Sequence, residues 1–152
     1  MFLAEDTFKT AIEHAPLESI DLVVKNSDGQ YLLGYRNNRS AKGYWFVPDG
    51  RILKNETMGQ AFIRLCKNEL GLDLVRSQAT FLSHFEHFYD DYVFGNEVST
   101  HYVVLGYQIE INLDLHHLPK EQHGDYKWFS KQALLDSDKV HKHSKWYLEG
   151  IK

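Results

Sequence analysis

The sequence predicts an α/β protein of the α+β type, in which a mixed β-sheet lies between helices. Two observations predict this class. Segments in which apolar residues alternate are interleaved with segments in which they recur every three or four positions, and an Asp-Gly turn signal joins two strands as a hairpin. The chain of 152 residues has no internal repeat and no Pro/Gly-rich linker. We therefore expect residues 1–152 to form a single domain.

Composition excludes several classes of protein. The chain has 17 Lys and Arg against 21 Asp and Glu, a net charge of −4, and 43% hydrophobic residues, so a folded core is expected. It has no basic cluster that would bind nucleic acid, and no signal peptide or membrane-spanning stretch. The single cysteine, Cys66, excludes an internal disulfide and predicts a small buried side chain. These features indicate a cytoplasmic protein.

The first half of the chain predicts a helix followed by a hairpin. Residues 4–14 suit a short helix, and alternation predicts a strand over 17–25. Asp28-Gly29 is a strong signal for a tight turn into a second strand over 31–36. A polar loop then leads to a short aromatic strand over 44–48.

The second half of the chain predicts one long helix, two strands longer than those of the first half, and then a short strand and two helices. Apolar residues over 57–70 recur at helical spacing, and Gly71 is well placed as the C-cap of that helix. Alternation predicts strands over 79–88 and 100–111. A short strand over 125–129 and helices over 130–136 and 140–149 complete the expected order.

The segment from position 50 to position 72 resembles a Nudix box. The residues that match its spacing are Gly50, Glu56, Arg64, Glu69, Gly71 and Leu72. The resemblance implies a Nudix fold, in which the loop and the helix surround a divalent cation that also binds a diphosphate. It gives Gly50, Glu56, Arg64 and Gly71 structural roles in the box, with Arg64 orienting the loop by ion pairing.

The carboxylates of this box are depleted. Positions 65, 68 and 69 share one helical face, yet they are Leu65, Asn68 and Glu69 where the usual box has three glutamates. Mg²⁺ keeps several waters and takes one or two carboxylates with phosphate oxygens. The box therefore suits one Mg²⁺ per subunit and not a cluster of metal ions.

Further segments resemble the GDP-mannose mannosyl hydrolases of the Nudix superfamily. They are residues 16–21, 37–39, 43–48, 87–91, 100–106 and 121–123. The resemblance implies a homodimer that hydrolyses GDP-mannose, or GDP-glucose, to GDP and the free sugar by attack of water on the anomeric carbon. That reaction tolerates a depleted box, because displacement at carbon mainly needs the departing diphosphate to be neutralised.

The resemblance also implies the metal ligands and the general base. Glu69 and Gln122 would bind Mg²⁺ through their side chains, and residue 49 through its backbone carbonyl. Asp49 stands where the family has glycine, but a carbonyl ligand survives any side chain that permits the turn. His123 would be the general base, since the ordinary pKa of histidine is about 6.5.

The remaining implied residues bind the substrate. Arg36 and Arg51 would hold the GDP phosphates, and Asp21 and Tyr102 would contact the leaving group; all four count as catalytic because charge grows there in the transition state. For His87 two roles stay open, a contact to the sugar and packing at a strand end.

The other histidines and a group of aromatic residues do not need a metal-binding or catalytic role. His84 and His87 lie three apart on a strand and face opposite sides, so they are not a metal pair. We expect His116-His117, the segment His141-Lys142-His143 and Arg39 to be solvated. About half of one aromatic group is expected to be core and the rest a lid over the substrate; its members are Phe85, Phe88, Tyr89, Tyr92 and Phe94.

Two other functions remain open from the sequence. An ordinary Nudix pyrophosphatase would split the same substrate into GMP and a sugar 1-phosphate, but Leu65 and Asn68 count against it. A non-catalytic module would bind a nucleotide sugar without turnover, but Glu69, Gln122 and His123 argue for activity.

Overall fold

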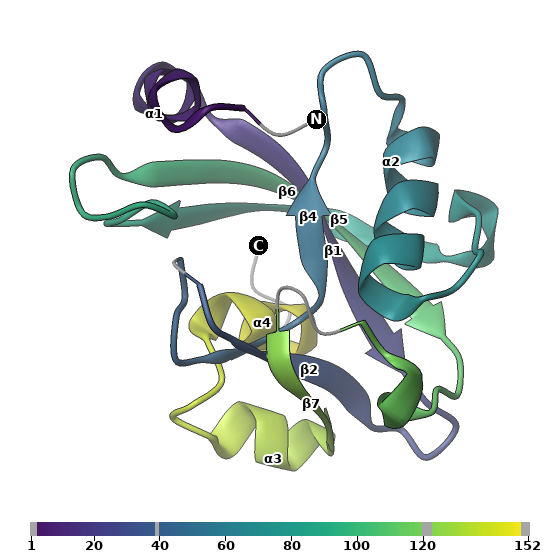
Figure 1. Cartoon of the computed structure of the whole chain (residues 1–152). Helices are drawn as coiled ribbons and strands as arrows, with labels where there is room; N and C mark the ends of the chain where they lie inside the picture. The colour runs from purple at the N-terminus through teal and green to yellow at the C-terminus, as the bar shows by residue number, and fades with distance from the viewer. Residues whose placement is uncertain (1–2, 39, 120–122, 150–152) are drawn as a thin grey trace.

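The structure is a computed structural model that describes residues 3–38, 40–119 and 123–149 (Figure 1). Its helices and strands, in chain order, are α1 Glu5–His14, β1 Leu17–Lys25, β2 Tyr31–Arg36, β3 Trp45–Phe46, β4 Asp49–Arg51, α2 Met58–Leu65, the π-helix η1 Cys66–Leu70, the 3-10 turn η2 Arg76–Gln78, β5 Thr80–Tyr89, β6 Thr100–Glu110, the 3-10 turn η3 Leu115–His117, β7 His123–Phe129, α3 Lys131–Asp136 and α4 Lys142–Glu149.

The strands of the described ranges form one sheet with the order β3-β2-β1-β6-β5. The sheet is mixed, as the sequence predicts. Only β1 and β6 run parallel among these pairs. β1 and β2 share a single Cα pair, Lys25 with Tyr31, because β4 pairs with the first half of β1 and β7 pairs with β2. The strands therefore diverge at one end, where β4 reaches the sheet.

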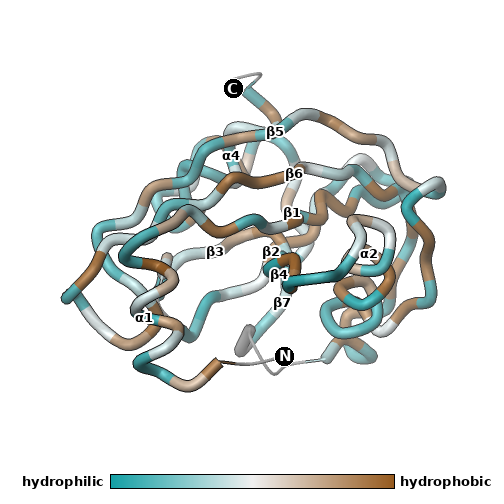
Figure 2. Tube along the Cα trace, turned by 90° about the horizontal axis from the view of Figure 1, so that it is seen from above, coloured by the Kyte–Doolittle hydropathy of each residue, from teal (hydrophilic) through white to brown (hydrophobic). Residues whose placement is uncertain are grey.

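Helices cover both faces of this sheet, which confirms the predicted layers. Ile20, Leu22 and Val24 of β1 pack in one cluster with α2, whereas Val23 packs in a second cluster with α3. This alternation follows from the period of two along a strand. Figure 1 shows α2 on one side and α3 and α4 on the other, and Figure 2 shows hydrophobic residues along β1 and β6 at the centre.

The box segment differs from its prediction in two places. Residues 49–51, for which the sequence predicts no strand, form β4, because their backbone pairs with β1. The helix predicted over 57–70 is α-helical only to Leu65 and continues as the π-helix η1. The predicted cap is confirmed: Gly71 has φ +69°, and its N–H donates to the carbonyl of Lys67.

Burial tests the predictions for individual side chains. Cys66 is buried, His87 is buried while His84 is exposed, and the pair His116-His117 is exposed, all as predicted. The expectation that residues 141–143 are solvated is wrong for both histidines, because α4 packs them against the aromatic residues of β3 and β5. Arg39 lies outside the described residues.

The predicted aromatic group divides as expected. Phe85 and Tyr92 are buried, Phe88 is exposed and stacks on His101, and Tyr89 and Phe94 line the pocket described below.

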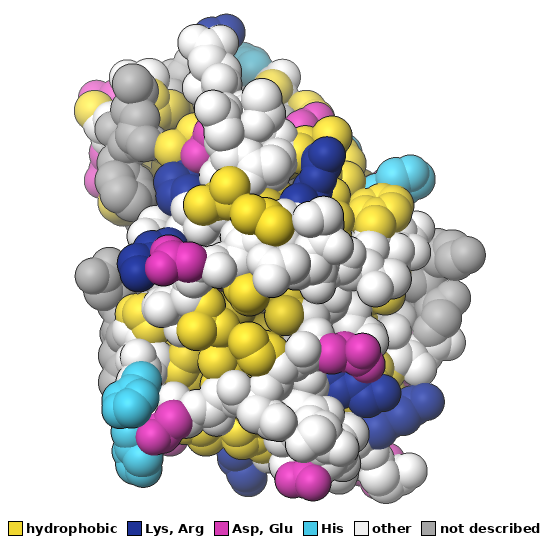
Figure 3. All heavy atoms as spheres, turned by 90° about the vertical axis from the view of Figure 1, so that its right-hand side faces the viewer, with side chains coloured by type: hydrophobic (Ala, Val, Ile, Leu, Met, Phe, Trp, Pro, Cys, Tyr) yellow, Lys and Arg dark blue, Asp and Glu magenta, His cyan; other side chains and the backbone are white. Residues whose placement is uncertain are grey.

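Two surface features complete the description. Apolar side chains gather on the face that carries α2 (Figure 3), where Met58, Ile63, Val75 and Phe81 are each about half exposed. Within the described ranges, no helix has the length and apolar character needed to span a membrane.

Candidate functional site

A pocket of about 530 Å³ lies beside β4 and is lined by strands, by helices and by the loops between them. Its lining includes eight residues that the sequence singles out: Arg36, Asp49, Gly50, Arg51, Arg64, Glu69, His87 and Tyr102. They come from strands β2, β4, β5 and β6, from α2 and from η1. The fold therefore brings residues far apart in sequence into one concave surface, which is the usual form of a ligand site.

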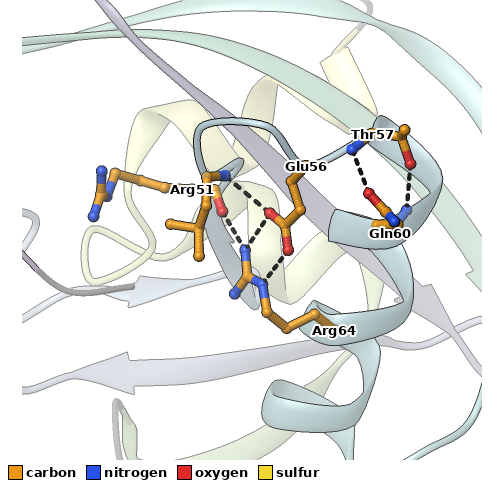
Figure 4. Close-up of polar contacts among 6 residues, drawn as sticks. Arg51, Glu56, Thr57, Gln60 and Arg64 are labelled. Atoms are coloured by element: carbon orange, nitrogen blue, oxygen red, sulfur yellow. Dashed lines mark hydrogen bonds and ion pairs between the residues drawn. The ribbon is translucent and has the colours of Figure 1, made fainter.

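Arg64 is held by Glu56, which supports its predicted structural role. Nε and Nη2 of Arg64 donate to the Glu56 carboxylate at 2.6 and 3.0 Å, and Nη2 also donates to the carbonyl of Arg51 at 2.7 Å. The hydrogen bond from Arg64 lowers the pKa of Glu56. Figure 4 shows this network between the loop and α2, beside the capping box of Thr57 and Gln60.

Arg51 points away from that network. Figure 4 shows its side chain extending to the opposite side from Arg64. Its guanidinium carbon lies 4.7 Å from the centre of the Phe8 ring on α1, a cation–π contact. Both residues line the pocket, so α1 helps to hold the Arg51 guanidinium at the pocket wall.

Arg36 occupies the pocket wall with a carboxylate beside it. Its Nη1 donates to Oδ1 of Asp49 at 2.8 Å, and its guanidinium carbon lies 5.4 Å from the centre of the Phe46 ring. The Arg36 side chain is only 11% exposed, and that of Asp49 19%. The residue that replaces the glycine of the usual box therefore pairs with a predicted phosphate ligand.

The apolar substitution in the box has a direct packing partner. A Cβ on Gly50 would lie 2.2 Å from Cδ2 of Leu65, so the two positions are complementary. Leu65, Asn68 and Glu69 all line the pocket, which confirms that they share one face. Glu69 is the one carboxylate among them and is only 8% exposed.

The pocket contains donors that fit a single cation. No group of three or more His, Cys, Asp or Glu residues that could hold a metal occurs in the described part of the chain. Glu69 and residue 49 nevertheless line the same pocket. One Mg²⁺ needs only one or two carboxylates when waters and phosphate oxygens complete its shell. These residues fit that requirement.

Asp21 lies behind the pocket wall and not on its surface. It is 1% exposed, its Cα pairs with that of Asp49 across β1 and β4, and its carboxylate accepts a hydrogen bond from the Tyr147 hydroxyl. Burial, followed by the nearby charge of Asp49, raises the pKa of Asp21. Asp21 therefore lies beside the Arg36–Asp49 pair but outside the pocket lining, because its side chain is buried against Tyr147. Its contact with the leaving group stays a prediction.

For two further predicted residues, the metal ligand Gln122 and the general base His123, the structure gives little or no placement. Gln122 lies outside the described residues. The backbone of His123 begins β7 and pairs with Arg36 of β2. The strand that carries the expected general base therefore runs beside the strand that carries a phosphate arginine.

Sequence reasoning missed the side chains that support the site from behind. Phe8 belongs to an amphipathic helix, a pattern that indicates burial but not the partner. Tyr147 and His143 follow from the docking of α4, which packs the Tyr147 ring so closely on Gly106 that a Cβ there would lie 2.7 Å from it. No local signal marks such contacts between distant segments.

The sequence matches the NUDIX domain family over residues 16–149, and the chain belongs to this family. A known relative, the low-salt glycan biosynthesis protein Agl8 of Haloferax volcanii, is 38% identical over 128 residues, which cover 84% of this chain and 79% of that protein. Membership in this family supports hydrolase activity.

Solved structures show the same fold. The MutT protein from Methanosarcina mazei Go1 matches with a TM-score of 0.73 and 18% identity, covering 93% of this chain and 96% of that one. The NUDIX domain of Shewanella oneidensis NrtR, in a cocrystal structure with ADP ribose, matches with a TM-score of 0.62 and 18% identity, covering 98% and 95%. The predicted Nudix fold is confirmed.

Proposed function

We propose that this protein hydrolyses GDP-α-D-mannose, or GDP-glucose, to GDP and the free sugar. The observation that carries the proposal is the composition of the pocket: Arg36 and Arg51 accompany a single box carboxylate, Glu69, while Leu65 fills another box position with an apolar side chain. The site therefore has cations for a diphosphate and little capacity to hold several metal ions.

This composition favours attack at the sugar carbon. Cleavage at phosphorus generally uses several metal ions to activate water and to gather phosphoryl charge. Displacement at the anomeric carbon mainly needs a stabilised leaving group, and arginines bind phosphate oxygens bidentately. Two arginines in the pocket support a GDP leaving group.

The proposal assigns a role to each group. Arg36 and Arg51 bind the diphosphate, and Tyr102, whose pKa burial raises to about 12, donates a hydrogen bond as a neutral phenol. Mg²⁺, held by Glu69, Gln122 and the carbonyl of residue 49, would supply further positive charge to the diphosphate. His123 accepts the proton of the attacking water, and the leaving GDP takes the electron pair of the broken C–O bond.

The relative from Haloferax volcanii supports a sugar substrate, because its name places it in glycan biosynthesis. A nucleotide sugar is the activated donor that such a process consumes. One Mg²⁺ per subunit, a homodimer and a cytoplasmic location complete the proposal.

Hydrolysis in ¹⁸O-labelled water tests the reaction. We expect label in mannose and, by proton NMR of the fresh product, the β anomer first, because a single displacement inverts the centre. His123→Gln should lower turnover by roughly 10²- to 10⁴-fold while GDP still binds. Label in phosphate with GMP as product would indicate the pyrophosphatase instead. Binding without any product would indicate a non-catalytic module, and the α anomer first would exclude direct attack.

A further inference from the structure

Behind the pocket wall lies a stack of buried rings that the proposed reaction does not use. His87 of β5 is 2% exposed, and its ring stacks on that of His143 of α4 with centroids 4.0 Å apart and an interplanar angle of 11°. His143 is itself 1% exposed. His87 lines the pocket, so His143 supports a pocket residue from behind.

Hydrogen bonds fix the orientation of this second layer. Nδ1 of His143 lies 3.1 Å from the Tyr89 hydroxyl, and Tyr89 also lines the pocket. The backbone N–H of His143 donates to Nδ1 of His141 at 3.2 Å, which ties the start of α4 to the preceding residue. His143 therefore touches two pocket residues, one through its ring face and one through its edge.

The rings of this layer are neutral. Burial lowers the pKa of His87 to about 3 and that of His143 to about 2, and burial raises the pKa of Tyr89 above its ordinary value. A neutral imidazole has one donor and one acceptor nitrogen, and a phenol can do both. Such groups recognise hydroxyls, whereas the arginines of the same pocket suit phosphate.

One atom of this layer lacks a partner. Nε2 of His87 is buried and makes no hydrogen bond to any described residue. A buried polar atom without a partner costs free energy, and a ligand hydroxyl in the pocket removes that cost. Phe46 contacts both the Arg36 guanidinium and the His87 ring, so the neutral groups adjoin the cationic part of the pocket.

We propose that His143 is a positioning residue for the sugar: it holds His87 and Tyr89 so that they bind hydroxyl groups of the hexose next to the diphosphate. This inference rests on the proposed function, because it takes a nucleotide sugar as the ligand. It assigns sugar recognition to β5 and α4, and diphosphate recognition to β2 and β4.

The test is His143→Phe, which keeps an aromatic ring against His87 and removes the nitrogen that contacts Tyr89. We expect the KM for GDP-mannose to rise about three- to tenfold, the loss of one hydrogen bond, while the inhibition constant of GDP is unchanged. His143→Gln, whose amide can still reach Tyr89, should restore part of the loss. His84→Phe, on the exposed side of the same strand, is the matched control and should change neither constant.

A second readout is independent of turnover. In ¹⁵N-histidine NMR spectra, GDP-mannose and not GDP should shift the ring nitrogens of His87, and this difference should shrink in His143→Phe. If that variant does not fold, His143→Leu removes the same nitrogen with a smaller apolar side chain, and the difference should shrink there as well. Equal loss of GDP and GDP-mannose affinity, or no change in either, would overturn the inference. Because this readout reports binding, it stands even if label from water appears in phosphate and the proposed reaction fails.

Discussion

Asp49 stands where the family that the sequence resembles has glycine, and it contacts a predicted phosphate-binding arginine. Its carboxylate accepts a hydrogen bond from Arg36, so it neutralises part of the charge that would meet a diphosphate. Asp49→Asn retains an oxygen acceptor and removes the negative charge. We expect the inhibition constant of GDP to fall about three- to tenfold, because the diphosphate no longer competes with a carboxylate for the guanidinium.

The control is Asp49→Gly, which keeps the backbone carbonyl and restores the usual residue. It should retain or improve turnover, because a carbonyl ligand does not need the side chain. If GDP binding weakens in both variants, Asp49 orients Arg36 instead of competing for it. The measurement is GDP inhibition at two salt concentrations, since a charge effect falls with salt.

Glu69 is the one carboxylate of the box face, so its removal should act on metal binding. We expect Glu69→Gln to raise the Mg²⁺ concentration for half-maximal activity by at least about tenfold, and to lower turnover at saturating Mg²⁺. Activity over a Mg²⁺ titration measures both. Glu86→Gln, an exposed glutamate on β5, is the control. Wild-type behaviour of the Glu69 variant would remove this residue from the site.

At the scale of elements, the pocket depends on the close packing of β4 against α2. Gly50 has no space for a Cβ because Leu65 occupies it. We expect Gly50→Ala to lower the free energy of unfolding by about 1–3 kcal/mol, the usual cost of overpacking. The effect is measured by urea denaturation.

In a Leu65→Ala background, Gly50→Ala should lower the free energy of unfolding much less, because the cavity left by Leu65 accepts the new methyl group. A coupling energy near zero in this double-mutant cycle would show that β4 moves to relieve the contact.

The two ends of the chain also act as elements of the site. α1 supplies the Phe8 ring beneath Arg51, and α4 supplies Tyr147 beneath Asp21 and His143 beneath His87. The Nudix box thus forms only one wall of the pocket. Residues that support Arg51 and His87, which line the pocket, come from segments outside the box.

For the whole molecule, the buried histidines make stability depend on pH. Their folded-state pKa values lie below the ordinary value of 6.5, so the unfolded chain binds more protons and the free energy of unfolding falls as the pH drops below 6.5. Each such histidine contributes a slope of about 1.4 kcal/mol per pH unit in that window. Asp21 acts in the opposite direction, because its folded-state pKa is raised and its contribution is lost as the pH rises.

His143→Phe isolates one of these contributions. Urea denaturation between pH 4.5 and 7 should show a shallower pH dependence in this variant than in the wild type, by about one proton. The exposed His84→Phe should match the wild type. If the free energy of unfolding depends on pH in the same way in the wild type and in His143→Phe, then His143 takes up a proton in the folded state as it does in the unfolded chain.

The sequence by itself determined most of the order of elements, the mixed sheet and the local structure of the box. Alternation in β1 and helical spacing in α2 report which face is buried, and the box spacing brings Glu56, Arg64 and Glu69 together within one local unit. Arg36 and Tyr102 were identified through family resemblance, and the structure places them in the same pocket.

The tertiary structure alone decided what lies behind that pocket. The residues 141–143 carry polar side chains and no hydrophobic period, so sequence reasoning places them in solvent; the docking of α4 against β3 and β5 instead buries His143 and partly buries His141. The pairing of Asp49 with Arg36 and the burial of Asp21 against Tyr147 likewise depend on segments that meet only in three dimensions. Local patterns indicate whether a residue faces the core, but not which distant side chain it contacts there. Those contacts determine the protonation state of the residue and its role.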